Sequence, residues 1–178
     1  MGLPPELWLV TGIPGAGKST VAHALAARLE RGAHVEGEAL WRQIVSGLAL
    51  PERELEGESE RQYELSIRNQ CLLARSYAEA GFTPVMDFVV VTRHHLDAYR
   101  SYLMGGLLRL VVLAPALEVV RMRDAARPDK HVGDRVAQLD AVLRSELAGT
   151  GLWVDSGALD IDQTVAAIVR GRQQAALR

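Results

Sequence analysis

Two hydropathy patterns alternate along the chain. Short strand-like runs, most of them almost wholly apolar and so typical of strands buried on both faces, lie at residues 7–11, 33–36, 83–91, 107–113 and 152–154. Between these runs apolar residues recur at helical spacing, over residues 19–31, 40–48, 60–80, 93–104, 115–126, 135–147 and from 161 to the last residue. Strands that alternate with helices predict a three-layer α/β fold, in which helices cover both faces of a central, mainly five-stranded parallel sheet.

Two polar segments interrupt the pattern. Residues 51–60, PERELEGESE, are acidic and poor in apolar residues, which predicts an exposed connection. Residues 127–134, RPDKHVGD, predict a loop between two helices. Neither segment looks like a domain boundary, so we expect residues 1–178 to form one domain.

Composition narrows the classes of partner. The 178 residues carry 20 basic and 22 acidic side chains, a net charge of −2, so no positive field favours nucleic acid or anionic lipid. A small-molecule partner is favoured. The N-terminus lacks the pattern of a signal peptide, and no run approaches the roughly 20 apolar residues of a membrane span. We therefore expect a cytoplasmic chain without a membrane partner, of open oligomeric state.

Cysteine and histidine residues indicate neither a disulfide nor a metal centre. Cys71 is the single cysteine, which excludes an internal disulfide. His94 and His95 are neighbours without further ligand-type residues at metal-binding spacing, so we expect surface residues rather than ligands.

The most specific motif follows the first strand-like run. Gly12-x-x-x-x-Gly17-Lys18-Ser19 has the spacing of a P-loop, with a strand before it and a helix after it. Glycines let successive backbone N–H groups approach phosphate oxygens, and the helix directs its positive end at the same anion. The motif predicts a nucleoside triphosphate, ATP or GTP, and we favour ATP. The expected nucleotide-binding residues are Gly12, Ile13, Pro14, Gly15, Ala16, Gly17, Lys18, Ser19, Thr20 and Arg121.

Three acidic residues follow two of the predicted strands. Asp87 is the charged residue within TPVMDFVVV and is expected to bind Mg²⁺ together with Ser19. Glu36 and Glu38 follow the second strand, where a carboxylate can hold an acceptor hydroxyl and take its proton. The alternatives are an aspartate bonded to local amides and two glutamates in a first helical turn. We assign the acceptor to Glu38, but which of the three is the base stays open.

The third group of candidate site residues consists of arginines. Arg121, Arg123 and Arg127 surround the loop at residues 124–134, and a lid there would bring positive charge to a transferring phosphoryl group while excluding water. The alternative is a solvated basic face. We expect Lys18, Arg123 and Arg127 to act in catalysis beside Glu38, with residues 37–80 forming the acceptor-binding region.

These residues together resemble the small P-loop kinases of the nucleotide-kinase fold, particularly chloramphenicol phosphotransferase, gluconate kinase and shikimate kinase. GIPGAGKST is the most specific part of the resemblance. Glu36-x-Glu38 is similar to the acid pair of shikimate kinase, and Glu38 matches the catalytic aspartate of chloramphenicol phosphotransferase. Arg123 and Arg127 resemble the paired lid arginines of gluconate kinase. The resemblance implies transfer of the γ-phosphate of ATP, with Mg²⁺, to a hydroxyl of a metabolite or antibiotic.

The sequence leaves two other functions open, a nucleotide or polynucleotide end kinase and a non-catalytic nucleotide sensor. A nucleotide or polynucleotide end kinase would use arginines such as Arg42, Arg61 and Arg68, but the polar pair that often follows the third-strand aspartate in such kinases is replaced here by Phe88-Val89. Those two residues, with Leu40 and Trp41, suit a partly apolar acceptor instead. A non-catalytic nucleotide sensor would present the helix at residues 60–80 to a partner.

Overall fold

The computed structural model describes residues 5–51, 55–125 and 135–177. The strands are β1 (Glu6–Thr11), β2 (Gly32–Glu36), β3 (Thr83–Asp87), β4 (Leu107–Leu113) and β5 (Leu152–Val154). The helices are α1 (Lys18–Ala27), α2 (Gly37–Trp41), α3 (Gly57–Glu79), α4 (Arg93–Tyr102), α5 (Leu117–Ala125), α6 (Arg135–Glu146) and α7 (Ile161–Arg170).

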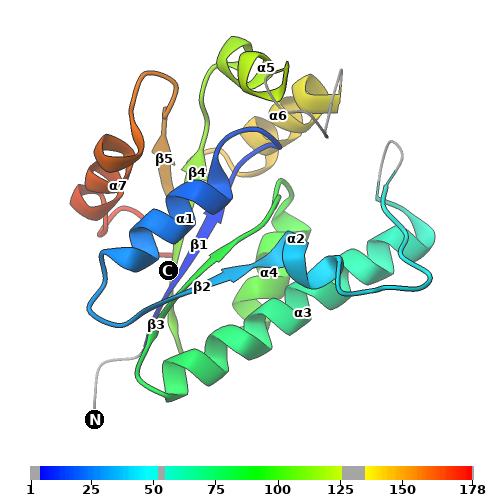
Figure 1. Cartoon of the computed structure of the whole chain (residues 1–178), viewed down its shortest axis with the longest axis horizontal. Coiled ribbons are helices and arrows are strands. Elements are labelled where there is room, and N and C mark those ends of the chain that lie inside the picture. The colour runs from blue at the N-terminus through cyan, green and yellow to red at the C-terminus, as the bar shows by residue number, and fades with distance from the viewer. Residues whose placement is uncertain (1–4, 52–54, 126–134, 178) are drawn as a thin grey trace.

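The strands form one parallel sheet in the order β2-β3-β1-β4-β5 (Figure 1). Helices α1 and α7 cover one face, whereas α3 and α4 pack on the other. Because β1 is paired on both sides and covered on both faces, Leu7–Val10 is almost fully buried, as a continuous apolar run predicts. The predicted α/β class and its five parallel strands are confirmed.

The order of the strands brings chemically active residues to one edge of the sheet. In the parallel register Asp87 lies beside Val10 on one side and beside Glu36 on the other. The carboxyl ends of β1, β2 and β3 are therefore neighbours, and the loop from β1 to α1 leaves from the same edge. Ligands of open α/β sheets bind at this edge.

The predicted helix at residues 40–48 is wrong beyond Trp41, where α2 ends. The side chain of Gln62 on α3 competes for the backbone of the following segment. Its Nε2 donates to the carbonyl of Gly47, and its Oε1 accepts from the N–H of Ala49. These tertiary hydrogen bonds hold the segment in an irregular path despite its helical hydropathy. Helix α3 begins earlier than predicted, because Glu56 and Ser59 form a capping box before its first turn.

The predicted strand at residues 83–91 is wrong beyond Asp87, where β3 ends. The hydroxyl of Thr11, the last residue of β1, donates to the carbonyl of Val90 and accepts from its N–H, both at 2.8 Å. The Thr11 hydroxyl thus bonds both backbone groups of Val90, whose N–H also donates to the carbonyl of Phe88 at 3.1 Å, and these bonds replace pairing with a neighbouring strand. The chain therefore leaves the sheet just after Asp87.

The last helix also ends before its predicted limit, at Arg170. The tail after it returns to β4, where the N–H of Leu110 donates to Ala175 and the N–H of Leu177 donates to Leu108. Most of the predicted lid, including Arg127, lies outside the described residues. Within the described part of the chain, no helix combines the length and hydropathy needed to cross a membrane.

Candidate active site

The loop between β1 and α1 forms a closed turn. The N–H of Ala16 donates to the carbonyl of Ile13 at 3.1 Å. Gly12, Gly15 and Gly17 all have positive φ values, at 150°, 85° and 94°. A Cβ at Gly12 would lie 2.5 Å from the carbonyl oxygen of Leu113, so only glycine fits there. Helix α1 begins at Lys18, and the N–H groups of its first turn, which have no helical acceptor, face this turn.

The P-loop residues differ in exposure. Ile13 and Ala16 are buried in the core and support the turn from beneath. Lys18 is half-buried, and its Nζ donates to the carbonyl of Ile13 at 3.2 Å, so the side chain folds back over the loop. Thr20 is exposed. The backbone and Lys18 can thus present N–H donors to one anion.

Ser19 lies at the centre of an oxygen-rich cluster. Its hydroxyl donates to Oδ2 of Asp87 at 2.8 Å and lies 3.4 Å from Oε1 of Glu36. Asp87 is only 2% exposed. One hydroxyl and two carboxylates are the hard oxygen donors that Mg²⁺ prefers, so this set fits the predicted metal. The structure therefore brings Ser19 and Asp87 together as expected and adds Glu36 to them.

His34 belongs to this cluster, although sequence reasoning missed it. Its Nε2 lies 2.6 Å from Oδ1 of Asp87, so both carboxylate oxygens of Asp87 are bonded. His34 and Glu36 are two residues apart on β2 and share a face of the sheet. That alternation was the signal that could have found His34 once Glu36 was suspected.

Gln70 on α3 supports the same strand ends from below. Its buried Nε2 donates to the carbonyls of Val35 at 2.6 Å and Asp87 at 3.0 Å, which ties β2 to β3. The hydroxyl of Tyr99 donates to Oε1 of Gln70. Burial raises the pKa of Tyr99 well above its ordinary value, so the hydroxyl stays a neutral donor. A signal existed in the sequence, because polar residues recur at helical spacing on the buried face of α3. They are Ser59, Gln62, Ser66 and Gln70.

Glu38 has other surroundings than Glu36. It lies in the first turn of α2, and its Oε1 accepts from Nε and Nη2 of Arg42, both at 3.0 Å. Both side chains are about two-fifths exposed. The two glutamates therefore have different surroundings, with Glu36 beside Ser19 and Glu38 on the partly exposed side of α2.

Of the three lid arginines, Arg123 reaches the P-loop. Its Nη2 donates to the carbonyl of Ser156 at 3.1 Å, and its Nη1 donates to the carbonyl of Ala16 at 3.5 Å. Arg121, on the same helix α5, is exposed. Arg123 thus lies beside the phosphate-binding turn.

The residues expected to border the acceptor are mainly core residues. Trp41 and Phe88 are buried, and Tyr63 stacks on Phe88 with a centroid distance of 4.6 Å and meets Trp41 edge-on at 5.5 Å. Leu40 and Val89 are partly buried. The expectation that both histidines lie on the surface is wrong for His95, which is 5% exposed between α3 and α4.

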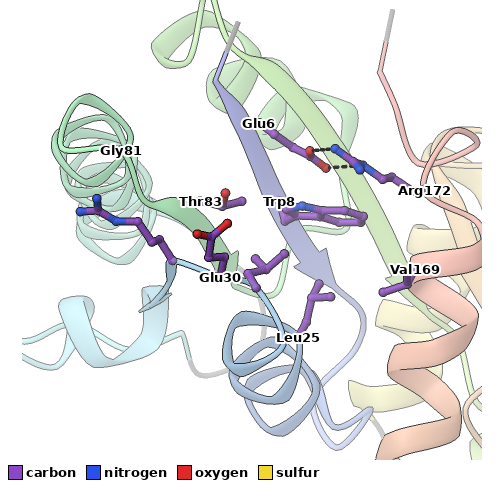
Figure 2. A pocket seen from close by; sticks show the side chains of 10 residues that line it. Glu6, Trp8, Leu25, Glu30, Gly81, Thr83, Val169 and Arg172 are labelled. Carbon is purple, nitrogen blue, oxygen red and sulfur yellow. Dashed lines mark hydrogen bonds and ion pairs between the residues drawn. The ribbon is translucent and has the colours of Figure 1, made fainter. Parts of the chain in front are cut away.

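A hollow of about 380 Å³ lies elsewhere, against the amino-terminal halves of β1 and β3 (Figure 2). Its lining includes Trp8, Thr83 and the ion pair of Glu6 with Arg172. None of its lining residues belongs to the P-loop. This hollow therefore does not compete with the carboxyl edge as the site of phosphate chemistry.

A family model and several curated proteins match this chain in sequence. A family model described as an AAA domain matches residues 7–149. The chain is 35% identical over 125 residues to the adenylyl-sulfate kinase of Vibrio parahaemolyticus, a match that covers 68% of this chain and 57% of that relative. It is 30% identical over 124 residues to the adenylyl-sulfate kinase of Paraburkholderia xenovorans, covering 67% of this chain and 63% of that relative. The chain thus spans less than two thirds of the length of these relatives.

Solved structures share the fold at low sequence identity. The APS kinase CysC of Mycobacterium tuberculosis, in complex with AMPPNP and APS, has a TM-score of 0.70 at 16% identity, covering 97% of this chain and 99% of that one. The tunicamycin resistance protein of Deinococcus radiodurans has a TM-score of 0.69 at 20% identity, covering 98% and 99%. A gluconokinase from Sinorhizobium meliloti 1021 has a TM-score of 0.66 at 21% identity, covering 97% and 95%. The family model shows that the chain belongs to the AAA domain family, and the solved structures show that it shares the nucleotide-kinase-like fold of small P-loop kinases.

Proposed function

We propose that the protein transfers the γ-phosphate of ATP to a hydroxyl group of a small molecule. The observation that carries this proposal is the bond of Ser19 to Asp87 at the first turn of α1, with Glu36 adjacent. This arrangement places a phosphate-binding turn and a set of oxygen ligands together at one edge of the sheet. Phosphoryl transfer needs both features, since its catalysis is mostly positioning and charge neutralisation.

The nucleotide would be held by the P-loop. Backbone N–H groups within residues 12–20, other than Pro14, and the Lys18 ammonium would bind the β- and γ-phosphates. Ser19, Asp87 and Glu36 would hold Mg²⁺, with His34 fixing the orientation of Asp87. When bound, Mg²⁺ neutralises charge on the phosphate oxygens. We also propose a role for Arg121 in nucleotide binding from the exposed side of α5.

Glu38 is the proposed base. Glu36 and Asp87 are both engaged at Ser19, whereas Glu38 is held by an exposed arginine. The acceptor oxygen would attack the γ-phosphorus while the bond to the β,γ-bridging oxygen breaks and ADP leaves. The acceptor proton would pass to Glu38. A carboxylate released from Arg42 by the entering hydroxyl is suited to that transfer.

Arginine residues would stabilise the transferring group. Arg123 already contacts the carbonyl of Ala16 in the P-loop, so a change of rotamer would bring its guanidinium to the phosphates. Arg127, in the proposed lid at residues 124–134, would act with it. We propose that residues 37–80 form the acceptor side of a single domain.

A nucleotide acceptor is the second candidate, supported by the 35% identity to an adenylyl-sulfate kinase. An anionic acceptor would need arginines on the acceptor side, where Arg42, Arg61 and Arg68 lie. Arg42 is paired with Glu38, and Arg61 is paired with Glu58. The Arg61–Glu58 pair would have to open as well, a step that an uncharged acceptor does not need, so we favour an acceptor with little negative charge.

The proposal is tested by measuring ADP release with ATP, Mg²⁺ and a panel of acceptors. The panel contains sugars and sugar acids, hydroxylated antibiotics, nucleosides and adenylyl sulfate. We expect release with one class, and a product heavier by one phosphoryl group in mass spectrometry. Turnover of adenylyl sulfate alone would select the second candidate. Binding of ATP with no acceptor turnover would indicate a sensor, and absence of any ATP binding would overturn both kinase proposals.

A further inference from the structure

A second cluster of ligand-type side chains lies between α3 and α4, and phosphoryl transfer does not use it. Glu60 on α3 and His94 and His95 on α4 each offer one ligand atom, and these three atoms lie within 4.8 Å of one another. Two ligands come from consecutive residues at the start of one helix, and the third comes from the helix packed against it. The tertiary fold therefore creates the cluster.

His95 is oriented as a ligand would be. It is 5% exposed, and its Nδ1 lies 2.9 Å from the hydroxyl oxygen of Thr92. The ring of Tyr63 packs on it with a centroid distance of 4.6 Å. These contacts direct Nε2 at Oε1 of Glu60, 3.0 Å away. Metal-binding histidines are held in the same way, through a hydrogen bond to the ring nitrogen that does not bind the metal.

The remaining members are accessible and negatively charged on balance. His94 is exposed, and its Nε2 lies 3.2 Å from Oε1 of Glu64, one turn beyond Glu60 on α3. Two carboxylates four residues apart on a helix repel each other. In the described part of the chain, the ion pairs of both carboxylates are with these imidazoles. A divalent cation between the helices would relieve this repulsion.

We propose that Glu60, His94 and His95 bind one zinc-class divalent ion, with Glu64 contributing charge beside it. Imidazole nitrogens select zinc and neighbouring transition metals over Mg²⁺, which prefers oxygen. Ligand atoms about 2.1 Å from a tetrahedral ion lie about 3.4 Å apart, so the cluster must contract slightly. Rotation of the exposed His94 and the partly exposed Glu60 supplies that movement.

Binding requires a simple exchange of hydrogen bonds. When the ion binds, the single proton of the neutral His95 imidazole lies on Nδ1 and no longer between Nε2 and Glu60, so the ion takes the place of that proton at Nε2. Nδ1–H of His95 then donates to the hydroxyl oxygen of Thr92. The ion would join the first half of α3 to the start of α4 and so fix Tyr63 against Phe88. The site is structural, and it does not depend on the proposed phosphotransfer.

The test measures zinc binding by the full chain after chelator treatment, with excess Mg²⁺ present to occupy the oxygen ligands near Ser19. Titration against a zinc-binding dye should give one equivalent bound. His94→Ala removes an exposed ligand and should leave the circular dichroism spectrum unchanged while weakening zinc binding at least tenfold. Zinc should also raise the Tm of the unaltered chain and not that of His94→Ala. Glu64→Gln should weaken binding less than His94→Ala.

His23→Ala is the matched control, since His23 is also an exposed helical histidine. Its zinc affinity should equal that of the unaltered chain. The proposal is overturned if no zinc binds, or if His94→Ala binds it as tightly as the unaltered chain does. Loss of the bound equivalent in His34→Ala but not in His94→Ala would locate the ion beside Asp87 and would overturn the proposal as well.

Discussion

The hydroxyl of Ser19 donates a 2.8 Å hydrogen bond to Oδ2 of Asp87 and so joins the first turn of α1 to the end of β3. The two residues are far apart in sequence, and the parallel sheet brings them together because β3 pairs directly with β1. Both oxygen atoms are thus held in place by the fold. A ligand set of this kind is pre-organised, since little side-chain entropy remains to be lost when an ion binds.

Asp87→Asn tests the metal ligand. The amide retains the shape of the side chain but loses its negative charge, so we expect Mg²⁺ affinity and kcat/KM to fall roughly 10- to 100-fold. Nucleotide binding without Mg²⁺ should change little. Isothermal titration with and without Mg²⁺ measures both. Asp97→Asn, on the exposed side of α4, should match the unaltered chain; equal losses in the two variants would contradict the role of Asp87.

Glu38→Gln tests the base. We expect kcat to fall about 10²- to 10⁴-fold while ATP affinity stays near that of the unaltered chain, because removal of a general base affects the chemical step. Fixed-time assays of product formation measure kcat, and titration with a fluorescent nucleotide measures the affinity for ATP. Glu36→Gln should instead weaken the response to Mg²⁺, since Glu36 lies beside Ser19. If Glu36→Gln alone stopped turnover at saturating Mg²⁺, Glu36 would be the base.

Gly12→Ala tests the packing of the P-loop. The added Cβ meets the carbonyl oxygen of Leu113 at 2.5 Å, on a backbone with a φ of 150°. We expect the free energy of unfolding to fall by roughly 2–4 kcal/mol and ATP binding to be lost. Urea denaturation measures the first effect. Gly47→Ala has a positive φ but no atom within 4 Å of the new Cβ, so it should cost only about 1–2 kcal/mol.

Cys71 provides a probe of the core. Burial raises the pKa of its thiol from 9.0 to about 12, so the folded chain holds this proton where the unfolded chain releases it. The resulting contribution to stability is complete below pH 9 and is lost as the pH rises toward 12. At pH 8 we expect alkylation of the folded chain to be about 1,000-fold slower than that of the urea-unfolded chain. Rapid alkylation of the folded chain would show that α3 opens locally.

Much of the fold follows from the sequence because its strongest patterns are local. The P-loop spacing and the apolar runs of β1 and β4 need no tertiary information. The errors arise where a distant side chain competes for the backbone. Gln62 ends the helical pattern after Trp41, and Thr11 ends the strand pattern after Asp87.

The candidate site likewise contains some residues that local sequence patterns mark and others whose position depends on the tertiary fold. Ser19 and Asp87 can be predicted to lie together because a motif and an isolated charge in an apolar strand mark them. His34 and Gln70 were missed because their importance depends on strand order and on which face of α3 meets the sheet. The expectation that His95 lies on the surface is wrong for a similar reason, because its burial depends on Tyr63 packing against it.

The hydroxyl of Thr11 also helps to hold the segment that follows Asp87. Its two bonds to the backbone of Val90 tie the end of β1 to the segment that follows Asp87 and continues to α4. Valine has the same shape but would remove the donor to the Val90 carbonyl and would leave the Val90 N–H with only its bond to the carbonyl of Phe88. The position of this segment beside the carboxyl edge of the sheet therefore depends in part on one side-chain oxygen atom.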